Sequence, residues 1–255
     1  MARDTKKSGG GSRRRLWLAL VALAVVTASA AWAGASLRRF ALNDPQFTLS
    51  RERRDSIMIH GLHFTSRAKV QRVFAEDFDR SVFAVPVAER RRRLLALDWV
   101  EDASVSRLWP HRLLVRVRER QPVAFVFFGS GVLLIDPWGV LLSPPAQSQF
   151  TFPVLSGVRE EEPESQRAER VRALLRVEQE LGARAKELSE VNAADLENIR
   201  IVTQADGRAV ELIMGDGDFG RRFQFFLDHY PEIQKRSPGA RTFDLRLDDR
   251  ITVKE

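Results

Sequence analysis

Residues 98–124 constrain the fold more than any other part of the chain, because two alternating segments flank a proline. Ala103, Val105 and Arg107 alternate with polar neighbours, and Leu113, Val115 and Val117 show the same two-residue period. Period-two alternation is typical of half-buried strands. Pro110 fixes φ between the two segments, and Pro122 lacks the N–H that a continuing ladder would need. The segment therefore predicts a β-hairpin that ends just before Pro122.

This hairpin resembles the second half of the polypeptide-transport-associated (POTRA) domain in the FtsQ/DivIB family of bacterial cell-division proteins. The chain departs from the family pattern at Asp98, where a proline is usual. The matching residues are Trp99, Val100, Ala103, Val105, Arg107, Trp109, Pro110, Leu113, Val115, Val117, Glu119, Arg120, Pro122, Val123 and Ala124. The resemblance implies a structural role for Gly61, Trp99, Arg107, Trp109, Pro110, Glu119, Arg120 and Pro122. We expect Trp109 to be largely buried where it closes the sheet.

The POTRA domain is expected over residues 55–122, in the order β-α-α-β-β that the resemblance implies. A short strand ends at Gly61, Thr65 or Ser66 caps a first helix, and Pro86 suits the first turn of a second helix. The run Arg90–Arg93 on that second helix is interpreted as a solvated face, with a lipid or partner contact as the alternative.

Residues Leu16–Leu37 form a charge-free apolar run of 22 residues. At 1.5 Å per residue, a helix of this length crosses a hydrocarbon core of about 30 Å. The sequence thus predicts a single-pass transmembrane helix over 16–37. A cleaved signal peptide is the alternative, because Ala28-Ser29-Ala30 has the small-x-small form of a cleavage site.

Basic residues flank the apolar run on both sides. Residues 1–15 carry a net charge of +5 and a glycine-serine run, so we expect a short disordered cytoplasmic tail. Residues 38–54 carry +3 and are expected to form a basic linker, which leaves 55–255 close to neutral. This distribution favours contact with anionic lipid over nucleic-acid binding. The positive-inside rule predicts a type II protein of the bacterial inner membrane, with its C-terminal domains in the periplasm.

Residues 123–255 are expected to form a second, β-rich domain of FtsQ type with a few helices, so the fold class is α+β. Hairpins are predicted around Gly129-Ser130-Gly131 and Ala205-Asp206-Gly207, and helices over 164–181 and from Phe219 to Tyr230. The aromatic row Phe219, Phe223, Phe226 and Tyr230 is interpreted as core. Gly215-Asp216-Gly217-Asp218 is interpreted as an N-cap, because it lacks the further acidic ligands of a calcium loop.

No residue pattern indicates catalysis, a cofactor or a small-molecule substrate. The chain has no cysteine, and His60, His63, His111 and His229 accompany no recognisable nucleophile motif. A metal site at His60 and His63 is the minor alternative to surface or turn packing. We therefore expect a protein that is not an enzyme.

The family resemblance implies a divisome scaffold that acts in septum formation at midcell. It implies binding to FtsB and FtsL, links to FtsW and FtsI, and a wider set of partners that includes FtsK and FtsN. The alternatives are an outer-membrane assembly or transport component, since POTRA domains also serve there, and a membrane-tethered hydrolase.

The end of the chain is expected to supply the partner-binding edge. Ile251, Thr252 and Val253 are suited to a strand, and an unpaired strand edge is a template for β-augmentation. Arg246 and Leu247 match the family's Asp-Leu-Arg motif and the apolar position after it. A solvated Arg246 on a protected edge is the alternative. The predicted partner-binding residues are Arg246, Leu247, Asp249, Arg250, Ile251, Thr252 and Val253.

Overall fold

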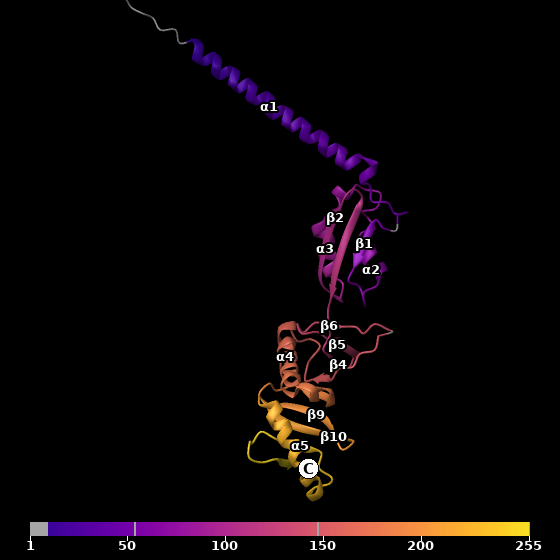
Figure 1. Cartoon of the computed structure of the whole chain (residues 1–255), viewed down its shortest axis with the longest axis vertical. Helices are drawn as coiled ribbons and strands as arrows, with labels where there is room; N and C mark the ends of the chain where they lie inside the picture. Colours follow the sequence, from indigo (N-terminus) through magenta and orange to yellow (C-terminus); the bar gives the residue numbers. More distant parts are fainter. Residues whose placement is uncertain (1–9, 54, 147, 255) are drawn as a thin grey trace, which may run out of the picture. The chain divides into compact units, whose positions relative to one another are not determined.

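The computed structural model describes residues 10–53, 55–146 and 148–254, and its chain divides into two compact units. The first unit extends to Arg118 and contains the long N-terminal helix and a small α/β domain. The second begins at Glu119 and contains a large mixed sheet (Figure 1). The mixed α+β class and the β-rich C-terminal region are confirmed.

Helix α1 (Gly10–Asn43) contains one candidate membrane span, Trp17–Asn43, with a mean hydropathy of 2.0 and none of it buried. The helix is longer than the predicted 16–37. It includes residues 10–15 of the predicted disordered tail, whereas residues 1–9 lie outside the described part of the chain. It ends before Asp44-Pro45, because the residue that precedes a proline is disfavoured in helical conformation.

The predicted basic linker over 38–54 is wrong as a separate segment. Its first six residues continue α1, and a 3-10 turn, η1 (Pro45–Phe47), follows with Asp44 as its N-cap. Phe47 and Leu49 are 5% and 0% exposed and belong to the core of the α/β domain. The core of the domain therefore already includes Phe47, which precedes the predicted start at residue 55.

The α/β domain has the predicted β-α-α-β-β order. Its strands form a three-stranded sheet in the order β1-β3-β2, in which β1 runs parallel to β3. The core lies between this sheet and the helices and is made of apolar residues such as Phe74, Leu94 and Leu113. The elements are β1 (Ile57–His60), α2 (Arg67–Arg72), the 3-10 turn η2 (Val82–Ala84), α3 (Val87–Leu95), β2 (Val100–Leu108) and β3 (Arg112–Glu119).

The second unit is organised around a nine-stranded sheet in the order β12-β11-β10-β9-β8-β7-β4-β5-β6. The predicted hairpins and helices are present, but β7 and β8 were not expected from the sequence. The elements are β4 (Ala124–Phe128), β5 (Gly131–Ile135), β6 (Leu141–Leu142), β7 (Val154–Ser156), α4 (Glu164–Leu181), η3 (Gly182–Glu187), β8 (Leu188–Asn192), β9 (Ile199–Ala205), β10 (Arg208–Gly215), α5 (Phe219–Arg236), β11 (Thr242–Asp244) and β12 (Thr252–Lys254).

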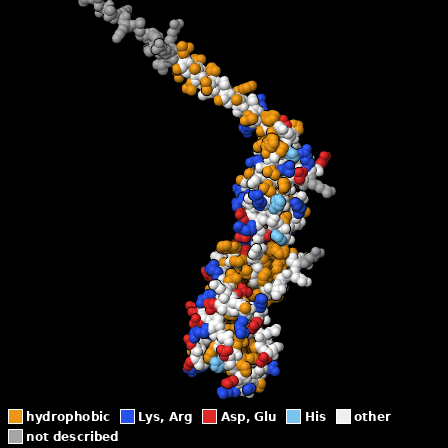
Figure 2. All heavy atoms as spheres, viewed as in Figure 1, with side chains coloured by type: hydrophobic (Ala, Val, Ile, Leu, Met, Phe, Trp, Pro, Cys, Tyr) orange, Lys and Arg blue, Asp and Glu red, His pale blue; other side chains and the backbone are white. Residues whose placement is uncertain are grey.

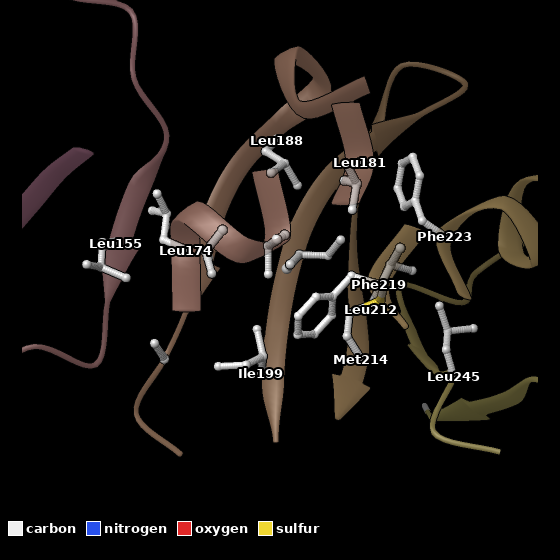
Figure 3. Packing of buried hydrophobic residues seen from close by; sticks show 14 of the residues in the cluster. Leu155, Leu174, Leu181, Leu188, Ile199, Leu212, Met214, Phe219, Phe223 and Leu245 are labelled. Atoms are coloured by element: carbon white, nitrogen blue, oxygen red, sulfur yellow. The ribbon is translucent and has the colours of Figure 1, made fainter. Parts of the chain in front are cut away.

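Helices α4 and α5 supply the apolar side chains that cover the central strands of this sheet. Leu174 and Leu181 of α4 and Phe223 of α5 point toward Leu212 and Ile199 of the strands (Figure 3). The predicted core row is confirmed, since its four aromatic residues are between 0% and 6% exposed. Their spacing places them on one helical face, which explains why the periodicity predicted them correctly.

Candidate partner-binding edge

Strand β12 is the outermost strand at one end of the nine-stranded sheet. It pairs antiparallel with β11, in a register that places Asp244 opposite Thr252 and Phe243 opposite Val253. Its other edge has no strand partner within the described residues. The side chains of Thr252 and Lys254 are exposed, whereas Ile251 and Val253 are half-buried against the core. An unpaired edge of this kind leaves main-chain donors and acceptors available.

The carboxylate of Asp244 contacts one residue in the loop between β11 and β12 and one in β12 itself. Its carboxylate accepts hydrogen bonds from Nε of Arg246 at 2.9 Å and from Nη2 at 2.6 Å, and Nζ of Lys254 lies 3.5 Å away. These contacts, the Arg246 hydrogen bond first, lower the pKa of Asp244 to about 2. The guanidinium of Arg246 is therefore engaged within its own chain, although its side chain is still 47% exposed.

The loop that joins the two strands is anchored to α5 on one side and open on the other. Arg221 of α5 donates to Asp248 at 2.8 Å, and Leu245 is buried. Leu247, in contrast, is 52% exposed. Asp249 and Arg250 pair with each other at 3.1 Å and are both exposed. The loop thus presents one apolar side chain and a surface ion pair.

A groove of about 210 Å³ lies between this loop and α5. It is lined by apolar and charged side chains of both elements: Phe225, His229, Glu232, Ile233, Arg236, Asp249, Arg250 and Ile251. Three of the predicted partner-binding residues therefore line one groove beside the open strand edge. The helical contribution was missed, because the sequence shows these residues only as the polar side of an amphipathic helix.

The start of α5 is capped differently from the prediction. Asp218 occupies the N-cap position with a φ of 55°, but its side chain makes no capping hydrogen bond. Instead, the carboxylate of Glu180, at the end of α4, accepts from the N–H of Phe219 at 2.6 Å. This cap comes from a residue 39 positions away. A search for local capping residues could not have found it.

Several motif residues of the α/β domain make backbone contacts that fix its turns. Arg107 donates from Nε to the carbonyl of Val82 at 2.9 Å and from Nη2 to that of Val85 at 2.8 Å. Gly61 has a φ of 85°, and a Cβ there would lie 2.0 Å from the carbonyl oxygen of Val117. Any larger residue at that position would clash with the backbone.

The motif residues after the hairpin are also in structural positions. Arg120 donates to the buried carboxylate of Asp136 at 2.8 Å, and the other oxygen of Asp136 accepts from the N–H groups of Trp138 and Val140. Glu119 and Pro122 are buried. Asp136 therefore organises the turn between β5 and β6, as expected from Asp136-Pro137-Trp138-Gly139 in the sequence.

The prediction that Trp109 is largely buried is wrong. Its side chain is 73% exposed, while Trp99 is only 9% exposed and packs on Phe64 at a ring distance of 4.7 Å. Trp109 and Pro110 form the turn of the hairpin, joined by a cis peptide bond. A residue at the tip of a two-stranded turn projects beyond the sheet, so no element covers it.

The prediction of a solvated face at Arg90–Arg93 is wrong for Arg90. Its side chain is 3% exposed and donates to both carboxylate oxygens of Asp77, at 2.6 and 3.0 Å. Asp77 is fully buried, and its hydrogen bond is the largest cause of the raised pKa of Arg90. Arg91, Arg92 and Arg93 are exposed as predicted. The position of Arg90 on the same helical face as Leu94 was the available signal.

The four histidines do not gather with other ligand types. The described residues contain no group of three or more histidine, aspartate or glutamate side chains positioned to hold a metal ion. His111 accepts from Arg53 at 2.7 Å, and His229 contacts the carbonyl of Phe225 at 2.8 Å.

Comparison with known proteins identifies the α/β domain and most of the chain. The profile of the FtsQ-type POTRA domain matches residues 54–120. The cell division protein FtsQ of Koribacter versatilis is 37% identical over 247 residues, which cover 94% of this chain and 70% of the relative. FtsQ of Shewanella oneidensis is 28% identical over a match that covers 93% of this chain and 86% of the relative. FtsQ of Myxococcus fulvus is 27% identical over a match that covers 79% of this chain and 71% of the relative.

The fold defines a class of protein: an N-terminal helix able to span a membrane, a POTRA domain, and a β-rich domain with an open sheet edge. Within that class the relatives decide the family. The chain belongs to the FtsQ family and is a membrane-anchored cell-division protein.

Proposed function

We propose that the chain is a non-enzymatic scaffold of the divisome, which captures an FtsB-like partner along β12 and thereby recruits FtsL and the septal synthesis proteins FtsW and FtsI. FtsK and FtsN belong to the same proposed set of contacts. The single observation that carries the proposal is the open edge of β12, beside a groove of about 210 Å³. Main-chain bonds along such an edge give affinity, and side chains in an adjacent groove give selectivity.

The chemistry of the site indicates what kind of segment fits. A partner strand would extend the sheet beyond β12, with apolar side chains packing against Leu247 and the apolar part of the groove. Arg236 and Arg250 line the groove together with Glu232 and Asp249. We therefore expect the partner segment to carry charges of both signs. Arg246 contributes less directly than its position in the motif suggested, because Asp244 already binds it.

Two proline variants test the edge. Adjacent residues of an antiparallel strand direct their main-chain groups to opposite sides. Thr252→Pro and Val253→Pro therefore form a matched pair, in which one removes a donor that faces β11 and the other a donor that faces outward. We expect one variant to lose stability and the other to keep its melting temperature while binding the FtsB homologue at least tenfold more weakly. Two variants that both fold and bind normally would place the partner site elsewhere.

Arg246→Glu is a poor test of a partner contact at Arg246. It reverses the charge but also places a second carboxylate beside Asp244, so loss of binding would not separate a partner contact from local repulsion. Leu247→Ser avoids this problem, because Leu247 is exposed and its replacement adds no charge beside Asp244. We expect Leu247→Ser to weaken the complex without lowering the melting temperature.

The proposed orientation places the N-terminus in the cytoplasm and both folded units in the periplasm at the septum. The basic residues before the apolar span support this orientation through the positive-inside rule. An enzymatic reporter fused after Glu255 is expected to be active only in the periplasm, with the full-length mass retained in the membrane. A mature protein that lacks its first 30 residues would show that the span is a cleaved signal.

A further inference from the structure

The tip of the POTRA hairpin combines exposed apolar side chains with arginines that have no carboxylate partner. Trp109 is 73% exposed, and Phe83 and Leu108 are 42% and 40% exposed. These three residues are named the tip patch. Exposed large apolar residues that lie together mark an interaction surface rather than ordinary surface variation.

A cationic pocket of about 470 Å³ lies at the same end of the domain. Arg51, Arg53 and Arg67 line it together with Ser56, Ile57, Gln71 and Phe78. None of these three arginines forms an ion pair with a carboxylate within the described residues. The guanidinium of Arg51 lies over the ring of Phe78 at 5.3 Å, and Arg53 donates to His111.

Direct contacts connect the pocket to the tip patch. His111, which Arg53 contacts, is two residues after Trp109. Arg107 binds the carbonyls of η2, which contains Phe83, and the ring of Phe83 lies 5.2 Å from that of Phe47. Two acidic residues are close in the sequence: Glu52 lies between Arg51 and Arg53, and Asp55 is paired with Arg112. Cationic and apolar side chains thus share one end of the domain, and Figure 2 shows both kinds there.

This end is also where the chain arrives from the membrane span. The span Trp17–Asn43 has 27 residues, so at 1.5 Å per residue it is about 40 Å long and reaches through the lipid headgroups. Phe47, which is buried in the POTRA core, follows Asn43 by four residues. Four residues reach at most about 14 Å. Chain length alone therefore keeps the buried start of the domain within a short distance of the headgroup layer.

We propose that the tip patch and the cationic pocket dock the POTRA domain on the bilayer, with anionic lipid headgroups at Arg51, Arg53 and Arg67 and Trp109 in the interfacial layer. Tryptophan is enriched at membrane interfaces, where one part of the ring is apolar and the N–H is wet. Arginines near an anionic surface add attraction that decays within the Debye length of about 8 Å. Docking would hold the POTRA domain at a defined distance from the membrane.

The test uses the full chain in liposomes and single cysteines as labelling sites, which the absence of native cysteine permits. Leu108→Cys places a fluorophore beside Trp109. Ala96→Cys places the same fluorophore at an exposed position near the other end of β2, a strand of nine residues and about 26 Å. Lipids that carry a nitroxide on the headgroup quench a fluorophore only at the bilayer surface.

In bilayers with about a quarter phosphatidylglycerol, we expect at least threefold stronger quenching of the label at 108 than of the label at 96. The difference should shrink on pure phosphatidylcholine and at high salt. The double variant Arg51→Gln, Arg53→Gln should lower the equilibrium constant for docking by about fivefold for each arginine removed. Trp109→Ala should also reduce quenching at 108, whereas Trp138→Ala, which removes a tryptophan 65% exposed in the other unit, should not.

Equal quenching at 108 and 96 in the anionic bilayer would overturn the proposal. It would also be overturned if the label at 108 were shielded only after other division proteins were added, because the patch would then be a protein-binding site. Circular dichroism of each variant establishes that the fold is intact. The outcome does not depend on FtsB binding, since β12 takes no part in the experiment.

Discussion

One ion cluster in each unit of the chain shows a different use of charged residues. In the POTRA unit, Arg90 and Asp77 form a fully buried bidentate pair beneath α3. In the C-terminal unit, a charge cluster surrounds Asp244 at the sheet edge, and Arg246 and Lys254 remain about half exposed. The first pair therefore supports the interior of its unit, whereas the second cluster lies at an edge that solvent reaches.

The largest effect is expected from breaking the buried pair. Asp77→Asn leaves the guanidinium of Arg90 without its buried counter-charge, since its remaining partners Glu76 and Glu89 are 67% and 42% exposed. Breaking a buried pair in this way typically costs about 3–5 kcal/mol. The free energy of unfolding, measured by urea titration of the detergent-solubilised chain, should fall by that amount. The exposed pair of Arg93 and Glu89 is the matched control, and Arg93→Ala should cost less than about 1 kcal/mol.

A double variant sharpens this prediction. Replacing both partners, Arg90→Met with Asp77→Leu, removes both buried charges and should recover most of the stability that Asp77→Asn loses. A single variant as stable as the parent would show that water reaches the pair. The contrast between the units would then be one of degree only.

Arginines that bind backbone carbonyls provide the second comparison. Arg167 of the C-terminal unit is buried and donates to the carbonyls of Gly139 at 2.7 Å and Glu160 at 3.0 Å, and also to that of Glu162. Arg107 of the POTRA unit makes similar bonds from an exposed position. Because buried carbonyls that lose a charged donor cannot turn to water, Arg167→Met should cost about 2–3 kcal/mol.

Arg107→Met should cost less, about 1 kcal/mol, since water can replace its bonds. Thermal unfolding of the two variants, compared with the parent chain, measures the difference. Equal losses would mean that the exposed arginine is as important to its unit as the buried one.

The sequence predicted the order of elements better than the positions of charged groups. Period-two alternation placed the POTRA hairpin, and helical periodicity placed the core row on α5, because both patterns depend on residues near one another in the chain. The partners of Arg90 and Phe219 lie 13 and 39 residues away. No local pattern carries that information.

The sequence likewise predicted only part of the candidate site. The open edge at Thr252 and Val253 followed from strand-forming residues near the end of the sequence. The groove was not predicted, because it depends on how α5 packs beside the loop. The pair of Arg246 and Asp244 was also missed, although only Leu245 lies between them in the sequence. The motif had suggested a partner for Arg246 outside the chain.

Acid should lower the stability of the parent chain more than that of a chain that lacks Asp244. The folded-state pKa of Asp244 is about 2, below its ordinary value of 3.8. Its contribution to stability is therefore fully present above about pH 4 and is lost as the pH falls toward 2. Because solvent around Arg246 screens the interaction, the free energy of unfolding should fall by only about 1–2 kcal/mol.

Asp244→Asn tests this pH dependence. The parent and the variant should differ in unfolding free energy at pH 6, and the difference should shrink between pH 4 and pH 2. Asp249→Asn is the control, because Asp249 lies in an exposed pair with Arg250. If the unfolding free energies of the parent and of Asp244→Asn changed in parallel between pH 4 and pH 2, the Asp244 carboxylate would not stabilise the sheet edge.

The smallest stability effect is expected at the most prominent motif residue. Trp109 is 73% exposed, so truncation to alanine creates no cavity and should change the unfolding free energy by less than about 0.5 kcal/mol. Trp99→Ala, at a residue only 9% exposed, should instead cost about 3–5 kcal/mol. Thermal unfolding of the two variants separates a tryptophan that stabilises the domain from one that is presented to its surroundings. If Trp109→Ala destabilised the chain as strongly as Trp99→Ala, the tip of the hairpin would be part of the fold, and its exposed position could not be assigned to membrane docking.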